Sequence, residues 1–248
     1  MLQSLHLMTL DYKFPSLMVV LYLIYVNSVN KKMSGNYQRG FKLRYFMILH
    51  NLGMSAFSFY VFIRSITLVY RFYTQNSLID AASDSNNVLS DGIYFYSYIF
   101  YISKIYEITD TLILHMNRKK ASFLQSFHHA GAIIATWLLC VSYSHLSWIF
   151  VVLNSFVHLI MYFYYFLATL GIKVRIKKII TTMQMVQFVS GIIMLLGHFY
   201  IASPFKGDQH TQKMQVIALI FNTSYALVLL MLFRLFFKKT YETKNKKE

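Results

Sequence analysis

The sequence predicts an all-α, polytopic membrane protein in which seven transmembrane helices form one bundle. Composition and apolar runs predict this fold class. Of the 248 residues, 56% are hydrophobic and only 13% are charged, and the mean hydropathy is positive. A helix of about 20 apolar residues spans a hydrocarbon core about 30 Å thick. Runs of this kind cover residues 14–29, 45–70, 93–116, 127–144, 148–170, 179–201 and 215–237.

The connections between these runs are too short for a separate soluble domain. We therefore expect residues 1–248 to form one transmembrane domain, with a basic cytosolic tail at 238–248. The first run has no basic segment before it and no small-residue cleavage site, which indicates a retained span rather than a signal peptide. The single cysteine, Cys140, lies within the fourth run and excludes an intrachain disulfide and a multi-cysteine metal site.

The formal net charge of +15 is concentrated in alternate connections. Basic residues follow the first, third, fifth and seventh runs, whereas the second connection carries Asp80, Asp84 and Asp91 and the fourth, "SHLS", carries no charge. The sixth has Lys206 and Lys213. By the positive-inside rule, the odd-numbered connections and the C-terminus lie in the cytosol and the N-terminus lies on the other side, which requires seven crossings. Basic loops of this kind need no nucleic acid as a partner.

The C-terminal sequence "KNKKE" gives an expected location. Lys246 and Lys244, third and fifth from the end, resemble the dilysine retrieval signals of endoplasmic reticulum membrane proteins. We expect a multi-pass protein of this membrane, with its N-terminus luminal and its C-terminus cytosolic.

Charged residues interrupt the third run. Lys104 lies near its middle, where an ionisable group costs about 3 kcal/mol or more. At 100° per residue, Lys104, Glu107 and Thr111 share one helix face, with Asp110 beside it. Ionisable residues inside a membrane are functional by default, and an ion pair of Lys104 with Glu107 that only fixes packing is the alternative.

Polar side chains recur at a similar depth in the next three runs. Singly, each fits a hydrogen bond within the bundle, worth about 1 kcal/mol. Their coincidence at one depth predicts a site that opens to the cytosol. They are Gln125, His128 and His129 in the fourth run, Asn154 and His158 in the fifth, and Gln184 and Gln187 in the sixth.

These residues resemble the motifs of the ELO-type very-long-chain fatty acid elongases, the 3-ketoacyl-CoA synthases of the endoplasmic reticulum. The resemblance implies seven transmembrane helices that enclose an acyl tunnel. Four ordered motifs across about 85 residues carry it: Lys104-x-x-Glu107-x-x-Asp110-Thr111, the histidine box at His128-His129, Asn154-x-x-x-His158-x-x-Met161-Tyr162-x-Tyr164-Tyr165, and Thr181-x-x-Gln184-x-x-Gln187-Phe188. The stretch "HNLGMSAFS" and the C-terminal segment are also similar to the family.

The resemblance implies fatty acid chain elongation by an acyltransferase, a 3-oxoacyl-CoA synthase. The reaction condenses a long-chain acyl-CoA with malonyl-CoA to a 3-ketoacyl-CoA and releases CO2 and CoA. On this basis His128 accepts the acyl chain as an acyl-imidazole, His158 positions malonyl-CoA, and His129 is an orienting or acid/base partner. Supporting or substrate-binding roles are expected for Lys104, Glu107, Asp110, Thr111, Gln125, Asn154, Met161, Tyr162, Tyr165, Gln184 and Gln187.

The same resemblance predicts no tightly bound cofactor and no metal, with acyl-CoA and malonyl-CoA as substrates. The expected partners are the lipid bilayer and the reductase and dehydratase enzymes of the elongation cycle, and a homodimer is left open. One position departs from the commonest family pattern, His-x-x-His-His, because Gln125 stands at its first histidine. A neutral amide can orient an imidazole but does not titrate near neutral pH, so this position is not expected to be an essential base.

Two other classes of protein remain as alternatives. Gln-x-x-His-His also occurs in membrane di-iron desaturases and hydroxylases, and imidazole suits iron. The other histidines, His6, His50, His115, His145, His198 and His210, are scattered singly and form no second paired box. A non-enzymatic seven-helix carrier would also place charges inside the membrane, although no internal repeat is evident.

Overall fold

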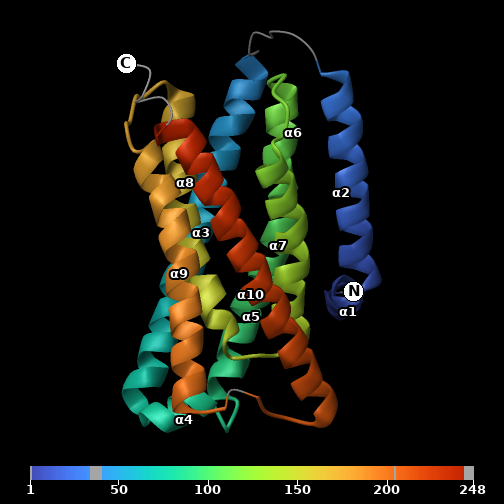
Figure 1. Cartoon of the computed structure of the whole chain (residues 1–248). Coiled ribbons are helices and arrows are strands. Elements are labelled where there is room, and N and C mark those ends of the chain that lie inside the picture. The colour runs from blue at the N-terminus through green and yellow to red at the C-terminus, as the bar shows by residue number, and fades with distance from the viewer. Residues whose placement is uncertain (1, 34–40, 204, 243–248) are drawn as a thin grey trace.

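The structure, a computed structural model, describes residues 2–33, 41–203 and 205–242 and is all-helical in this part of the chain (Figure 1). The predicted all-α class is confirmed. Long helices run along a common axis and short connections join them. The elements are α1 (Leu2–Leu10), α2 (Lys13–Lys32), α3 (Phe41–Gln75), α4 (Leu78–Ser83), α5 (Val88–Tyr106), α6 (Ile108–Met116), α7 (Phe123–Val141), α8 (Ser147–Leu170), α9 (Lys177–Ile201), α10 (Gln209–Phe237) and the π-helical turn η1 (Lys238–Glu242).

Local sequence explains where α7 begins and ends. The side chain of Ser122 accepts a hydrogen bond from the N–H of Gln125 at 3.2 Å, so the helix starts before the predicted apolar run. It ends at Val141 because Tyr143 adopts a left-handed backbone conformation with φ of 49°. The cap places the first polar residues of α7 inside the helix, where their side chains have fixed directions.

The predicted third run is divided into two helices, α5 and α6, by the single residue Glu107. The N–H of Asp110 donates to the Glu107 carbonyl at 3.0 Å, an i to i+3 bond that tightens the backbone locally. Glu107 keeps helical angles of −61° and −13°, so the two helices follow one another closely. A tightened turn inside a helix often marks a functional hinge or a strained segment.

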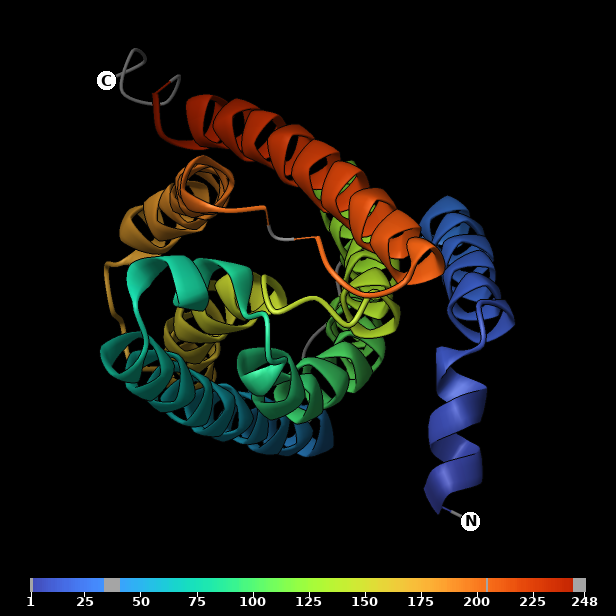
Figure 2. The same cartoon turned by 90° about the horizontal axis from the view of Figure 1, so that it is seen from below.

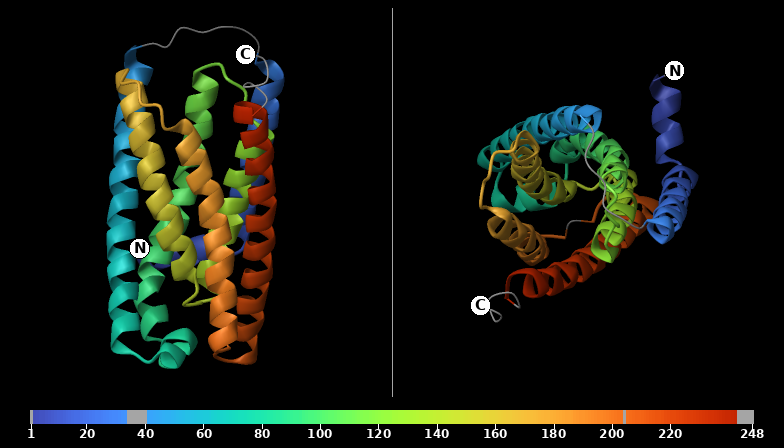
Figure 3. Two further views of the ribbon diagram at one scale, coloured as in Figure 1. Left: turned by 60° about the vertical axis from the view of Figure 1, so that its left-hand side comes forward. Right: turned by 90° about the horizontal axis from the view of Figure 1, so that it is seen from above.

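Contacts between helices close a ring in the order α3, α5, α7, α10, α9 and α8, with α8 packing back against α3. Figure 2 and the right-hand view of Figure 3 show this ring along its axis, with α1 and α2 outside it. Outside the ring, α2 packs against α6 and α7. The inner faces of the ring helices therefore converge on one axis, and polar residues on those faces can meet.

Five described helices, α3, α7, α8, α9 and α10, are long and apolar enough to cross a membrane. A sixth crossing follows if α1 and α2, which are bent by 64° relative to each other, form one span. The structure therefore supports a multi-pass membrane protein. By length and composition, however, the described helices give five or six membrane crossings rather than the predicted seven. The α5–α6 pair is not among these helices, and it carries Lys104, Glu107 and Asp110 in a tyrosine-rich sequence.

Charged residues lie near both ends of the bundle. Lys31 and Lys32 lie in the last turn of α2, at the end of the molecule where α10 also ends in Figure 1. At the opposite end, near α4, Asp84 is buried and its Oδ2 pairs with Lys206 Nζ at 2.5 Å. This ion pair joins the α4–α5 connection to the α9–α10 connection.

Candidate active site

Lys104 and Glu107 form an ion pair inside the ring. Only 3% of Lys104 and 1% of Glu107 are exposed. Lys104 Nζ donates to Glu107 Oε1 at 2.6 Å and to Asn154 Oδ1 on α8 at 2.9 Å. Pairing and hydrogen bonding are what allow a charge to stay ionised in a medium of low dielectric. The ion pair between Lys104 and Glu107 that the sequence suggested is thus formed, and a hydrogen bond from Lys104 links it to α8.

His158 approaches the same carboxylate from α8. It lies one helical turn beyond Asn154, so both side chains face the same way. His158 Nδ1 is 3.3 Å from Glu107 Oε1. The second carboxylate oxygen, Glu107 Oε2, is buried and has no hydrogen-bond partner in the described part of the chain. A carboxylate at this distance can orient an imidazole ring.

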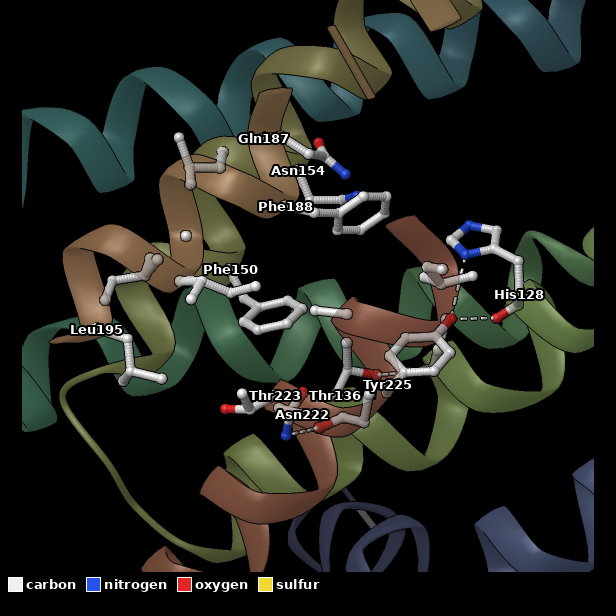
Figure 4. Close-up of a pocket in the computed structure, with 18 of the residues that line it drawn as sticks. His128, Thr136, Phe150, Asn154, Gln187, Phe188, Leu195, Asn222, Thr223 and Tyr225 are labelled. Atoms are coloured by element: carbon white, nitrogen blue, oxygen red, sulfur yellow. Dashed lines mark hydrogen bonds between the residues drawn. The ribbon is translucent and has the colours of Figure 1, made fainter. Parts of the chain in front are cut away.

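His128 of α7 completes a group of three. One nitrogen or carboxylate oxygen from each of Glu107, His128 and His158 lies within 4.8 Å of the others. His128 Nδ1 is 3.1 Å from the hydroxyl oxygen of Tyr225 on α10. That hydroxyl donates to the backbone carbonyl of His128 at 2.6 Å (Figure 4). Residues from α5–α6, α7, α8 and α10 therefore meet at one point.

His129 does not share this position. Successive helical residues are rotated by about 100°, so His129 and His128 meet different neighbours, although their ring centroids are only 5.4 Å apart. Its ring meets the ring of Tyr22 on α2 edge to face, with centroids 6.2 Å apart. The structure thus brings His128 and His158 together but places His129 between the ring and α2.

An apolar cavity extends from His128. It contains about 670 Å³ of space not filled by protein atoms, part of it open to the outside. Figure 4 shows His128 at one end of it and Phe150 and Leu195 at the other. A second cavity shares Phe150 and Leu195 with the first and continues to Ser144 and Gln215. His128 therefore lies at the polar end of this apolar space, together with Lys104 and Asn154.

Asp110 belongs to a second network on α6. Its Oδ1 is 2.7 Å from His50 Nε2 on α3, and its Oδ2 accepts a hydrogen bond from the Tyr162 hydroxyl at 2.6 Å. His50 Nδ1 also lies 3.2 Å from the Tyr106 hydroxyl. Tyr162 is fully buried, and its ring centroid is 5.6 Å from that of His158. Asp110 thus fixes Tyr162 against one of the two central histidines.

Thr111 and Gln125 lie on the α2 side of the bundle. Thr111 Oγ1 is 3.0 Å from the Tyr22 hydroxyl, and the Gln125 amide nitrogen donates to Thr111 Oγ1 at 3.3 Å. Neither residue lines the cavity. The amide of Gln125 therefore binds a hydroxyl group and links α7 to α6.

The candidate residues on α9 and at the end of α8 differ in whether they line the cavity. Gln187 lines the cavity, and its Oε1 is buried without a partner among the described residues. Gln184 Nε2 lies 3.6 Å from Met161 Sδ and joins α9 to α8. The Tyr165 ring packs on Tyr162, with centroids 6.5 Å apart. Of these residues, only Gln187 reaches the cavity.

Comparison with known proteins identifies the family. Residues 7–248 match the family described as ELO, the GNS1/SUR4 family. The chain belongs to this family. It is 30% identical over 240 residues to "Fatty acid elongase sre1" of Dictyostelium discoideum, which covers 96% of this chain and 87% of that one. It is also 31% identical over 208 residues to "Fatty acid elongase A" of the same organism, covering 82% and 74% of the two chains. A Trypanosoma cruzi protein named "Very long chain fatty acid elongase 4" is 30% identical over 234 residues, covering 89% and 79%.

Three potential metal ligands meet in this ELO-family site, because Glu107, His128 and His158 converge. Three protein ligands are enough for a catalytic zinc. However, the Lys104 ammonium lies 2.6 Å from Glu107 Oε1, so a metal ion there would stand beside another cation. This charge arrangement favours acid/base and nucleophilic chemistry over ligation.

Sequence reasoning misses two residues of the ELO-family site. One is His50, which the sequence shows only as a single histidine outside any box and which contacts Asp110. Its signal is its place in "HNLGMSAFS", a stretch that resembles the family, but a single residue on a distant helix has no spacing that indicates a partner. Tyr225 has no signal, because it is one of 20 tyrosines in an apolar chain.

Proposed function

We propose that this protein is the condensing enzyme of fatty acid elongation, an acyltransferase that joins a long-chain acyl-CoA to malonyl-CoA. Curated relatives of the same family are named fatty acid elongases, which supports elongation. One observation carries the chemistry: His128, His158 and Glu107 converge within 4.8 Å at the polar end of an apolar cavity. Nucleophile, acid/base partner and apolar chain site are thus adjacent.

In the first step the His128 imidazole attacks the carbonyl carbon of the acyl thioester. The carbon–sulfur bond breaks, the sulfur leaves with the electron pair, and the proton that the imidazole loses completes CoA–SH. The product is an acyl-imidazole on His128. An imidazole suits this role because it is largely neutral near pH 7 and can act as both nucleophile and leaving group.

In the second step malonyl-CoA loses CO2. The bond to the carboxylate carbon breaks, and its electron pair stays on the α-carbon as an enolate. This carbon attacks the acyl carbon, the carbon–nitrogen bond of the acyl-imidazole breaks, and the nitrogen regains its electron pair. A proton from solution restores the imidazole. Each turnover therefore consumes one proton and yields 3-ketoacyl-CoA, CO2 and CoA.

The residues around His128 are suited to stabilise the enolate oxygen. Asn154 lines the cavity, and its side-chain oxygen accepts a hydrogen bond from Lys104. The side-chain nitrogen of Asn154 is therefore available as a donor. His158 is oriented by Glu107 and can donate a proton or a hydrogen bond. Donors fixed before the reaction cost no reorganisation when charge develops, which makes them effective in a dry site.

The apolar cavity is the proposed site of the acyl tail. Phe150, Phe188 and Leu195 line it, and each buried CH2 of a chain gains about 0.8 kcal/mol. The second cavity extends this space toward Ser144 and Gln215. A tail attached at His128 would therefore run toward the end of the ring that holds α4.

We further propose seven crossings, with α5–α6 as one of them, an N-terminus in the lumen of the endoplasmic reticulum and a C-terminus in the cytosol. Lys31 and Lys32 in the last turn of α2, at the end of the bundle where α10 also ends, support this orientation. Lys244 and Lys246 of the proposed retrieval signal lie outside the described residues. The proposed partners are the reductase and dehydratase of the elongation cycle, without a resident cofactor or metal, and a homodimer stays open.

The test is a membrane assay with radiolabelled malonyl-CoA and a panel of saturated and unsaturated acyl-CoAs. It compares the native chain with His128→Ala and with His210→Ala, a matched control at an exposed histidine outside the site. We expect label incorporation that depends on the acyl-CoA, is lost in His128→Ala and persists in His210→Ala.

Two results would contradict the proposal. Turnover that persists in His128→Ala would refute the role of this histidine. No incorporation across the panel from well-expressed native protein would refute condensation itself, and stoichiometric iron in that protein would then favour the di-iron alternative.

A further inference from the structure

The contact between His128 and Tyr225 determines which imidazole nitrogen carries the proton. A carbonyl oxygen can only accept a hydrogen bond, so the Tyr225 hydroxyl must donate its single hydrogen to the His128 carbonyl, 2.6 Å away. Toward His128 Nδ1, 3.1 Å away, the same oxygen can then act only as an acceptor. Nδ1 must therefore carry a hydrogen.

A neutral imidazole has one N–H, so the lone pair is left on Nε2. We propose that Tyr225 is a positioning residue that holds His128 in the Nδ1–H tautomer and so makes Nε2 the nucleophile. This inference rests on the proposed function, because it assigns the attacking atom of that reaction. The nitrogen held by Tyr225 has its lone pair in the aromatic system and does not attack.

The packing of α7 against α10 holds the hydroxyl in this place. A Cβ atom at Gly131 would lie 2.3 Å from Tyr225 Cε2, so only glycine allows the ring to approach α7 this closely. Phe127 and Phe221 flank the ring, with centroids 5.8 and 6.2 Å from it. Tyr225 is 7% exposed. The hydroxyl is therefore fixed before substrate binds, as a positioning group requires.

The hydrogen bonds also connect the ring of His128 to its own backbone through one hydroxyl. The imidazole is thereby restrained about its side-chain torsions as well as in its tautomer. Figure 4 shows both bonds meeting at the Tyr225 oxygen. Partners that orient metal-binding histidines in a similar way contribute about 10- to 100-fold to metal affinity or activity, and we expect an effect of this size at His128.

The first experiment compares Tyr225→Phe with the native chain and with Tyr101→Phe. Tyr101 is a matched control, because its hydroxyl is buried and donates to the Thr9 carbonyl at 2.9 Å, away from the cavity. Radiolabelled acyl-CoA is added without malonyl-CoA, and the acyl-enzyme formed per unit time is measured. We expect Tyr225→Phe to form it about 10- to 100-fold more slowly, with the KM for acyl-CoA little changed, and Tyr101→Phe to match the native rate.

The second experiment fixes the tautomer chemically. In the Tyr225→Phe background, His128 is replaced by Nδ1-methylhistidine or by Nε2-methylhistidine. The first leaves only Nε2 free to attack, and the space of the missing hydroxyl accommodates its methyl group. Acylation of the Nδ1-methyl ring gives an acyl-imidazolium that has no proton to lose, so the CoA thiolate takes its proton from solution. We expect the Nδ1-methyl protein to form acyl-enzyme and the Nε2-methyl protein to form none.

If the native chain forms acyl-enzyme and Tyr225→Phe forms it at the same rate, the inference is overturned and the proposed function stays intact. Acylation of the Nε2-methyl protein would also overturn it, because Nδ1 would then be the attacking atom. If the native chain forms neither acyl-enzyme nor condensed product, the proposed function fails and the inference fails with it.

Discussion

Removing the charge of Glu107 while Lys104 remains should destabilise the protein strongly. In Glu107→Gln, the Lys104 ammonium keeps its buried position, with 3% exposed surface, but retains only neutral oxygen partners such as that of Asn154. Breaking one partner of a buried ion pair costs about 3–5 kcal/mol, a large part of a typical stability of about 5–15 kcal/mol. For a chain of this size, that corresponds to a fall in Tm of about 6–20 °C.

The double variant Lys104→Met, Glu107→Gln removes both charges. It distinguishes the cost of leaving one buried charge unpaired from the cost of changing the side-chain packing. It should recover most of the stability, because no uncompensated charge remains inside the ring. Thermal unfolding in detergent of the native chain, both single variants and the double variant forms a double-mutant cycle. We expect a coupling energy above about 2 kcal/mol. Additive losses, with the double variant less stable than either single one, would refute the reasoning that the two charges depend on each other.

Two further predictions concern groups outside this pair. Burial opposes ionisation of Asp84, but hydrogen bonds from Lys206 and Ser90 outweigh it and hold the pKa of this carboxyl below its ordinary value. A depressed pKa stabilises the fold above the unfolded pKa of about 3.9 and loses this contribution as the pH falls through the folded value. Native stability in detergent should therefore fall below about pH 4, whereas Asp84→Asn should be less stable at neutral pH and show a weaker dependence. Replacing His50 by Gln removes the imidazole that contacts Asp110 at 2.7 Å, and it should lower kcat about tenfold while leaving the KM for acyl-CoA similar. An unchanged kcat would show that Asp110 holds Tyr162 without this contact.

The helical framework could be predicted because its determinants are local. Apolar runs give the long helices, and residues 14–29, 148–170 and 179–201 lie within α2, α8 and α9. The division of the third run at Glu107 could not be predicted in this way. It depends on a carboxylate that contacts residues on α5 and α8, and the periodicity of one helix contains no information about such partners.

The candidate site was predictable only in part for the same reason. The spacing of Asn154 and His158 places both on one face, and the structure keeps them together. The direction of that face, however, depends on the order of helices in the ring. Pattern reasoning groups His129, Gln125 and Thr111 with the central residues, but it does not give their partners. Thr111 contacts Tyr22 on α2, Gln125 contacts Thr111, and the ring of His129 lies near both Tyr22 and His128.

The same ring explains how α5–α6 can serve as a membrane span despite its composition. A charge exposed to lipid costs about 3 kcal/mol or more, and hydropathy counts each charge as if it were exposed. In this protein Lys104 and Glu107 neutralise each other, and they also contact Asn154 and His158 on α8, inside the ring. The insertion cost of the isolated helix is therefore offset only after α8 packs beside it. On the proposed topology, the least apolar span depends most on its neighbours, and it is also the span that supplies the charges of the active site.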